Sequence, residues 1–221
     1  DPSLSLLLQS EVYKIEKKYS ELKNIYEKML KSKKTETLGY RGLMEQNLNN
    51  QDYHHAFIYG EKLFHLNPKI EKIYETLVYV IAKTRNWNQL ISITDKALNY
   101  KLITKNKYNE NKSIALYEIA KVKLNSDLKE TIKIISKALE LNKNFPPFIK
   151  FQLEAISKTK NISNLKKLIK NYWYKNPNSL LRYVLLEIII QNNLDNLDFI
   201  KQLVKNNFND EESKKLFIFF A

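Results

Sequence analysis

Three histidines, a residue type that often binds metal or haem, fall in one stretch of this 221-residue chain, DYHHAFIYGEKLFHLNP. They are His54, His55 and His65. The first two are adjacent, and adjacent side chains point about 100° apart on a helix. His65 lies about 16 Å further along a helix axis, at 1.5 Å per residue. Metal–nitrogen bonds are near ~2 Å, so we expect no metal or haem site built from these three alone, although a single axial haem ligand stays open.

Paired carboxylates are the other residues that could do chemistry, as general acid and base. Glu211 with Glu212 and Asp195 with Asp198 are examples, but such residues on helices mostly face solvent or cap helix ends. No Ser/His/Asp arrangement stands out, the chain has no cysteine, and its three glycines form no GxGxxG loop. We therefore expect no catalytic residues, no metal and no cofactor.

The composition favours a globular helical chain. It is 43% apolar, with only 3 glycines and 5 prolines to interrupt helices. It does not begin with Met, and no apolar run approaches the ~20 residues that span a bilayer. We expect a soluble region taken from a longer protein. The missing cysteines fit a reducing compartment and exclude a disulfide scaffold.

The net charge of +13 raises the question of nucleic-acid binding. Only Arg41, Arg85 and Arg182 are arginines, the residue that recognises phosphates and bases with paired hydrogen bonds. The lysines are scattered among acidic residues, as in KIEKKYSELKNIYEKMLK. This pattern indicates a solvated basic surface and no specific nucleic-acid partner. Weak attraction to an anionic membrane or an acidic partner stays open.

Internal repeats give the strongest signal in the sequence. Helix–turn–helix patterns start near Ser3, Thr37, Glu71, Lys112, Pro146 and Leu180, with spacings of 34, 34, 41, 34 and 34 residues. Thirty-four residues is the tetratricopeptide period. We predict an all-α fold, a right-handed tetratricopeptide superhelix spanning residues 1–221. It has about six helical hairpins and a C-terminal capping helix over about residues 210–221.

The one long spacing carries seven extra residues, near two helical turns. They fall in KLITKNKYNENK, Lys101–Lys112, where Thr104 is a candidate N-cap. We expect the first helix of the fourth repeat to be extended at its start.

Several phrases resemble a known family more closely than the period alone does. The stretches from Asp1, from Glu36 and from Arg85, above all LGYRGL at Leu38–Leu43, resemble the tetratricopeptide region of the HemY-type proteins of proteobacteria. The long linker before Lys112 also falls where that family has its longer spacing. The sequence departs from the family at Asn176, where NPN replaces a more usual Pro-His-Pro.

The resemblance implies an inner-membrane protein that belongs to late haem or porphyrin biosynthesis. Its transmembrane helices would precede this region, which would face an undetermined side of the membrane. Partners would be proteins, with haem-biosynthesis enzymes as candidates, and the function would be that of a non-catalytic scaffold. The competing class is a tetrapyrrole-binding carrier or a haem-pathway enzyme.

The binding face of such an array follows from position within the repeat, because the first helix of each hairpin lines the concave surface. Positions two, five, nine, twelve and thirteen of these helices usually face inward. They select eleven candidate partner-binding residues: Arg41, Glu45, Lys72, Glu75, Tyr79, Lys83, Leu116, Lys123, Lys150, Glu154 and Lys158. A groove of mixed charge with an aromatic ring suits an extended peptide or a partner helix.

Two glycines flank the first of these candidates in GYRGL. Gly39 and Gly42 each cost about 1 kcal/mol relative to alanine inside a helix. Their presence predicts close approach of either another helix or a ligand beside Arg41.

The apolar end KKLFIFFA has two interpretations. It is either a final helix that covers the last repeat, or an interfacial anchor or dimer contact. Deleting the last eight residues separates the two, because only the first predicts a loss of thermal stability.

Overall fold

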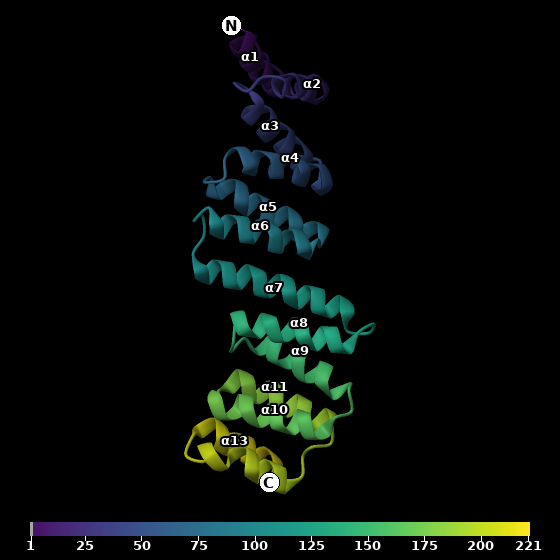
Figure 1. The fold of residues 1–221 in the computed structure, drawn as a ribbon, viewed down its shortest axis with the longest axis vertical. Coiled ribbons are helices and arrows are strands. Elements are labelled where there is room, and N and C mark those ends of the chain that lie inside the picture. The colour runs from purple at the N-terminus through teal and green to yellow at the C-terminus, as the bar shows by residue number, and fades with distance from the viewer. Residues whose placement is uncertain (1) are drawn as a thin grey trace. The chain divides into compact units, whose positions relative to one another are not determined.

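The computed structural model describes residues 2–221, and no strand occurs among them (Figure 1). Helices alternate between two sets, which we call the first and second helices of six hairpins. The first helices are α1 (Pro2–Ile15), α3 (Glu36–Asn49), α5 (Glu71–Thr84), α7 (Lys105–Lys123), α9 (Pro146–Ser157) and α11 (Ser179–Gln191). The second helices are α2 (Tyr19–Met29), α4 (Tyr53–Leu66), α6 (Trp87–Asn99), α8 (Leu128–Leu141), α10 (Ile162–Lys175) and α12 (Leu197–Val204). A 3₁₀ turn, η1 (Lys205–Asn207), and α13 (Glu211–Phe220) follow.

The all-α class and the array of tetratricopeptide hairpins are confirmed. The second helices of the first three hairpins begin 34 residues apart, at Tyr19, Tyr53 and Trp87. The irregular spacing is explained by α7, which has 19 residues where the other first helices have 12 to 14. As predicted, the extra residues are at its start, and Thr104 Oγ1 accepts a hydrogen bond from the Lys107 backbone N–H at 3.2 Å.

Short polar side chains set where many of the helices begin. In six helices an Asp or Asn before the first turn accepts a hydrogen bond from the backbone N–H three residues later, which satisfies a donor that the helix leaves open. These residues are Asp52, Asp127, Asn161, Asn178, Asn196 and Asp210. Pro146 occupies the first position of α9, where its missing N–H costs nothing.

The tight turns of the hairpins use left-handed backbone conformations without glycine. Lys17, Gln51, Arg85, Lys160 and Asn193 each follow a first helix and have φ between 52° and 59°. The first three are 34 residues apart, in step with the helices. Lys101, with φ 57°, follows α6 in the same way.

The chain divides into two compact units, one ending at Asn111 and the other running from Lys112 to Ala221. In unit 1, α1 to α6 pack in order, each against the next. Its core includes Leu43, Leu63, Phe64 and Leu77, all with 0% exposure. The start of α7 belongs to this unit, since the Asn111 amide donates to the Tyr74 hydroxyl at 2.7 Å.

In unit 2, α9 lies against α8, α10 and α11. Buried side chains on α7 to α13 form one core, which includes Phe148 of α9 and Trp173 of α10. Tyr117 of α7 packs its ring against Phe148 and Phe151, with centroids 5.0 and 5.3 Å away.

The last helix, α13, covers the end of unit 2, as the first interpretation of the apolar terminus predicts. It contacts α11 and α12 and buries Ser213 and Leu216 completely. Ile218 and Phe219 on the same helix stay exposed, at 73% and 57%. Among residues 2–221 no helix is long and apolar enough to cross a membrane.

An ion pair with little solvent exposure joins this cap to α11. Arg182 Nε donates to Glu212 Oε2 at 2.7 Å, and the two side chains are 14% and 17% exposed. Lys215 Nζ donates to the other carboxylate oxygen at 2.9 Å. The hydrogen bond from Arg182 is the main cause that lowers the pKa of Glu212 below its ordinary value of 4.5.

We expect the substitution Glu212→Gln to lower the melting temperature at pH 7 and to lose this effect in acid. Since the folded-state pKa is depressed, the carboxylate stabilises the fold above its ordinary pKa, and that contribution disappears as pH falls through the lowered value. Thermal melts at a series of pH values measure the difference. Glu211→Gln is the matched control, because that neighbour is 73% exposed. A difference between Glu212→Gln and the native chain that does not change with pH would contradict the prediction.

Candidate binding surfaces

The three histidines do not gather at one place, although the adjacent rings of His54 and His55 meet edge-on with centroids 5.4 Å apart. His55 lies at the start of α4, where its Nδ1 is 2.7 Å from Asp52 Oδ2 and its backbone N–H donates to the same carboxylate. These bonds, the backbone one first, lower the pKa of Asp52. His65 lies near the end of α4, with Nε2 3.2 Å from Lys96 Nζ. In residues 2–221 no three His, Asp or Glu side chains gather as a metal-ligand group. The histidine stretch forms α4, the second helix of the hairpin that begins with α3.

The structure places all eleven predicted binding residues on first helices, or at the end of one, but in two separate units. Arg41 and Glu45 lie on α3; Lys72, Glu75, Tyr79 and Lys83 on α5; Leu116 and Lys123 on α7; Lys150 and Glu154 on α9, with Lys158 at its C-cap. The two groups differ in how far their side chains are engaged with the rest of the protein.

In unit 1 three of the four predicted α5 residues line a shallow hollow of about 470 Å³. Its lining is Leu48 and Asn49 at the end of α3 with Lys72, Glu75, Thr76 and Tyr79 of α5. Lys72 Nζ is 3.8 Å from Glu75 Oε2, and both side chains are more than half exposed. Contacts of this kind are too weak to hold the side chains against a competing ligand.

Tyr79 is the aromatic residue of this surface and is 50% exposed. Its ring meets that of Tyr53 edge-on, with centroids 6.2 Å apart, and Lys83 Nζ lies 5.4 Å from the ring centroid. The neighbouring Tyr79 side chain is the main cause that raises the pKa of Tyr53. Tyr53, on α4, is a member of the surface that the repeat positions did not select.

Arg41 and Glu45 are exposed on α3, outside the lining of the hollow. Gly39 and Gly42, the glycines beside Arg41, lie on the side of α3 that packs against α2. A Cβ atom on Gly39 would lie 2.8 Å from the backbone oxygen of Tyr26, and one on Gly42 would overlap the Tyr26 ring. Of the two explanations that the sequence left open, the structure supports close helix packing for these glycines.

In unit 2 two of the predicted residues, Lys150 and Glu154, take part in ion pairs. Lys150 Nζ donates to Glu187 Oε2 of α11 at 2.7 Å and lies 3.9 Å from Glu154 Oε1. The bond to Glu187 raises the pKa of Lys150, whereas burial raises the pKa of Glu154. Leu116 is half-buried and packs against the core. Lys150, Glu154 and Leu116 are consequently less available to a partner than the exposed predicted residues of α3 and α5.

The rule based on repeat positions did not select Glu187. This residue does not occupy position two, five, nine, twelve or thirteen of the repeat that starts at Leu180. A search for an acidic residue about one repeat after Lys150 could have found it, since the two are 37 residues apart.

Comparisons with known proteins give no family for the chain: no family model matches the sequence, and no curated protein matches it. Among solved structures it is similar to PilF of Pseudomonas aeruginosa, with 11% identity, TM-score 0.40 and coverage of 96% of this chain and 95% of that one. It is also similar to PilW, a type IV pilus biogenesis factor, with 16% identity, TM-score 0.38 and coverage of 98% of each chain. A third is YrrB, described as a TPR protein with an unusual peptide-binding site, with 14% identity, TM-score 0.37 and coverage of 78% and 85%. With TM-scores below 0.5, these likenesses do not bear on function, and the assignment of the architecture rests on the helices described above.

Proposed function

We propose that this protein is a non-catalytic scaffold for protein–protein interaction, and that the α3–α5 face of unit 1 binds an extended peptide or a helix of its partner. The observation that supports this is the hollow between α3 and α5, where Tyr79 is half exposed among solvent-exposed charges of both signs that make only weak contacts.

An exposed tyrosine beside a hollow is a typical anchor for a partner, because its ring contributes a large contact area and its hydroxyl a hydrogen bond. Lys72, Glu75 and Lys83 around Tyr79 offer charges that fix the register of a bound segment more than they add affinity. Arg41 and Glu45, on the neighbouring first helix, extend this surface beyond the hollow.

We further propose, from the HemY-type resemblance alone, that the partners belong to haem biosynthesis. On this proposal the full protein is held at a bacterial inner membrane by helices outside the sequence described here. The side of the membrane that it faces is not part of the proposal.

The experiment that tests the scaffold is affinity purification with the full-length, membrane-anchored protein, followed by identification of the captured proteins. We expect Arg41→Ala to abolish capture of a specific partner, and Tyr79→Ala to do the same, while helicity and melting temperature stay unchanged. Both side chains are exposed, so their removal leaves the core intact. Lys62→Ala, on the exposed side of α4, is the matched control. Parallel loss of capture and of stability would make Arg41 a packing residue.

The competing class, a tetrapyrrole carrier or haem-pathway enzyme, makes a different prediction. A carrier would bind haem or a porphyrin saturably, one molecule per chain, with a spectrum sensitive to replacement of a histidine or tyrosine. We expect a spectroscopic titration to give no such binding. A saturable one-to-one titration that His65→Ala or Tyr79→Phe alters would replace the scaffold with the carrier. Electrostatic binding of nucleic acid or anionic lipid, the third class, would weaken steeply as salt rises.

A further inference from the structure

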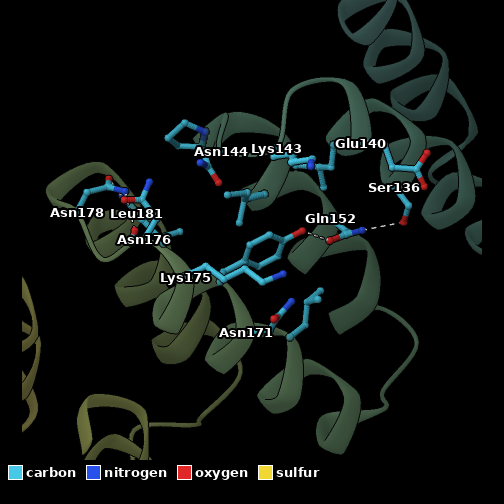
Figure 2. A pocket seen from close by; sticks show the side chains of 15 residues that line it. Ser136, Glu140, Lys143, Asn144, Gln152, Asn171, Lys175, Asn176, Asn178 and Leu181 are labelled. Atoms are coloured by element: carbon cyan, nitrogen blue, oxygen red, sulfur yellow. Dashed lines mark hydrogen bonds between the residues drawn. The ribbon is translucent and has the colours of Figure 1, made fainter. Parts of the chain in front are cut away.

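Unit 2 contains a pocket of about 600 Å³ on the side formed by its second helices (Figure 2). It lies between α8 and α10, and side chains of α9 form its floor. The turns before α9 and before α11 complete its rim. We call it the α8–α10 pocket. None of the eleven residues predicted from repeat position lines it.

The floor is a continuous chain of hydrogen bonds across three helices. The Tyr172 hydroxyl donates to Gln152 Oε1 at 2.5 Å, Gln152 Nε2 donates to Ser136 Oγ at 2.8 Å, and Ser136 Oγ donates to the Ile132 carbonyl at 2.7 Å. Burial raises the pKa of Tyr172 to about 12, so the hydroxyl keeps its proton at neutral pH. The Tyr172 oxygen can still accept a bond, and Gln152 Nε2 carries a second N–H.

This polar floor differs from the equivalent positions of the α5–α6 hairpin in unit 1, which are apolar. Gln152 is the seventh residue of α9, and the seventh residue of α5 is Leu77; Tyr172 is the eleventh residue of α10, and the eleventh of α6 is Ala97. Leu77 and Ala97 are both fully buried. A buried polar pair is tolerated only when it is hydrogen-bonded, and an apolar pair is the simpler way to fill this place. Where a sequence breaks its own core pattern, a functional site is the usual reason.

The rim of the pocket offers cations and amides. Lys143, in the turn after α8, and Lys175, the last residue of α10, line it from opposite sides, and neither makes an ion pair with any residue of the described chain. Glu140 is the single carboxylate of the lining. Asn144, Asn171 and Asn176 add side-chain amides, each with a donor and an acceptor that match one peptide group.

We propose that the α8–α10 pocket binds a short extended peptide segment that carries an Asp or Glu side chain. The carboxylate lies between Lys143 and Lys175, and the asparagine amides bind the peptide groups on either side of it. Gln152 and Tyr172 supply a second N–H and an acceptor to the part of the segment that reaches the floor. A volume of about 600 Å³ is within the usual range of ligand sites and far larger than one small anion needs.

A test uses two sets of fluorescein-labelled nonapeptides with random flanks, one with Glu at the centre and one with Gln. The full chain is immobilised, and retention of each set is measured. We expect the Glu set to be retained about tenfold better, the effect of one charge-assisted hydrogen bond. Lys143→Glu and Lys175→Glu should each remove that preference, whereas Lys137→Glu, on α8 but outside the lining, should keep it.

The variant Gln152→Leu places at position 152 the residue type that Leu77 has at the same position of α5. It shows whether a loss of peptide binding occurs without a loss of stability. We expect it to lower retention of the Glu set at least tenfold while the melting temperature stays the same or rises. If it fails to fold, the two lysine variants decide the question. Equal retention of the Glu and Gln sets, or unchanged retention by both lysine variants, overturns the proposal. So does a chain that binds only inorganic phosphate or phosphatidylserine vesicles. Loss of partner capture by Arg41→Ala is independent of these results.

Discussion

Replacing Trp173 with alanine is expected to destabilise unit 2 by about 3–5 kcal/mol, the usual cost of removing a buried aromatic side chain. The indole is fully buried in the core of this unit. The indole Nε1–H donates to Ser213 Oγ of the capping helix at 3.1 Å, and Asn207 Nδ2 donates to the backbone carbonyl of Trp173 at 3.4 Å. The substitution removes both the packing volume and the link to α13.

Denaturant unfolding followed by circular dichroism measures this loss, with two variants for comparison. Trp87→Ala, at the partly exposed start of α6, removes the same side chain and should cost clearly less. Trp173→Phe keeps most of the volume but leaves Ser213 without its donor, so an intermediate loss of about 1–3 kcal/mol is expected. If Trp173→Ala unfolds at the same denaturant concentration as the native chain, the indole does not hold α13 in place.

The second large effect concerns the substitution Gly39→Ala, for which two opposing contributions decide whether stability rises or falls. Alanine gains about 1 kcal/mol of helix propensity over glycine. Its Cβ, however, would lie 2.8 Å from the Tyr26 backbone oxygen and 3.1 Å from Met29 Cβ, so the backbone of α2 must move. Overpacking of this kind costs about 1–3 kcal/mol. We expect Gly39→Ala to be a net loss of stability, measured by thermal melting.

Gly42 three residues later is the natural comparison. The three atoms nearest to a Cβ at Gly42 all belong to the ring of Tyr26, a side chain that can rotate away. Gly42→Ala should therefore cost less than Gly39→Ala, and Tyr26→Ala should restore stability to the Gly42 variant alone. Equal losses at the two glycines, both rescued by Tyr26→Ala, would show that the ring, and not the α2 backbone, limits the approach of the helices.

The sequence predicted those features of the fold that its repeats and its helix caps encode locally. The 34-residue period located the hairpins, and the one irregular spacing, with the N-cap candidate Thr104, located the extended start of α7. The repeat positions chosen for the binding face did not show which side chains pair between successive first helices, such as Lys150 with Glu187, or between α11 and the cap, such as Arg182 with Glu212. These pairs are at least 30 residues apart and belong to no motif.

The pocket in unit 2 was missed for a different reason. Repeat positions on first helices direct attention to one face, whereas the α8–α10 pocket lies on the face of the second helices. A signal was nevertheless present in the sequence. Glutamine at position 152 stands where another repeat has Leu77, and a search for polar residues at apolar repeat positions would have selected it.

The hairpin turns have a consequence for engineering. At Lys17, Gln51, Arg85 and Lys160 an ordinary side chain is held in a backbone region that costs such residues about 1–2 kcal/mol each. Glycine adopts this region freely, so replacing these residues with glycine removes that cost. Part of the gain in stability is offset by the greater freedom of glycine in the unfolded chain. The array therefore contains a set of separate, surface positions at which strain can be released step by step, and a more heat-resistant version can be built without altering either binding surface.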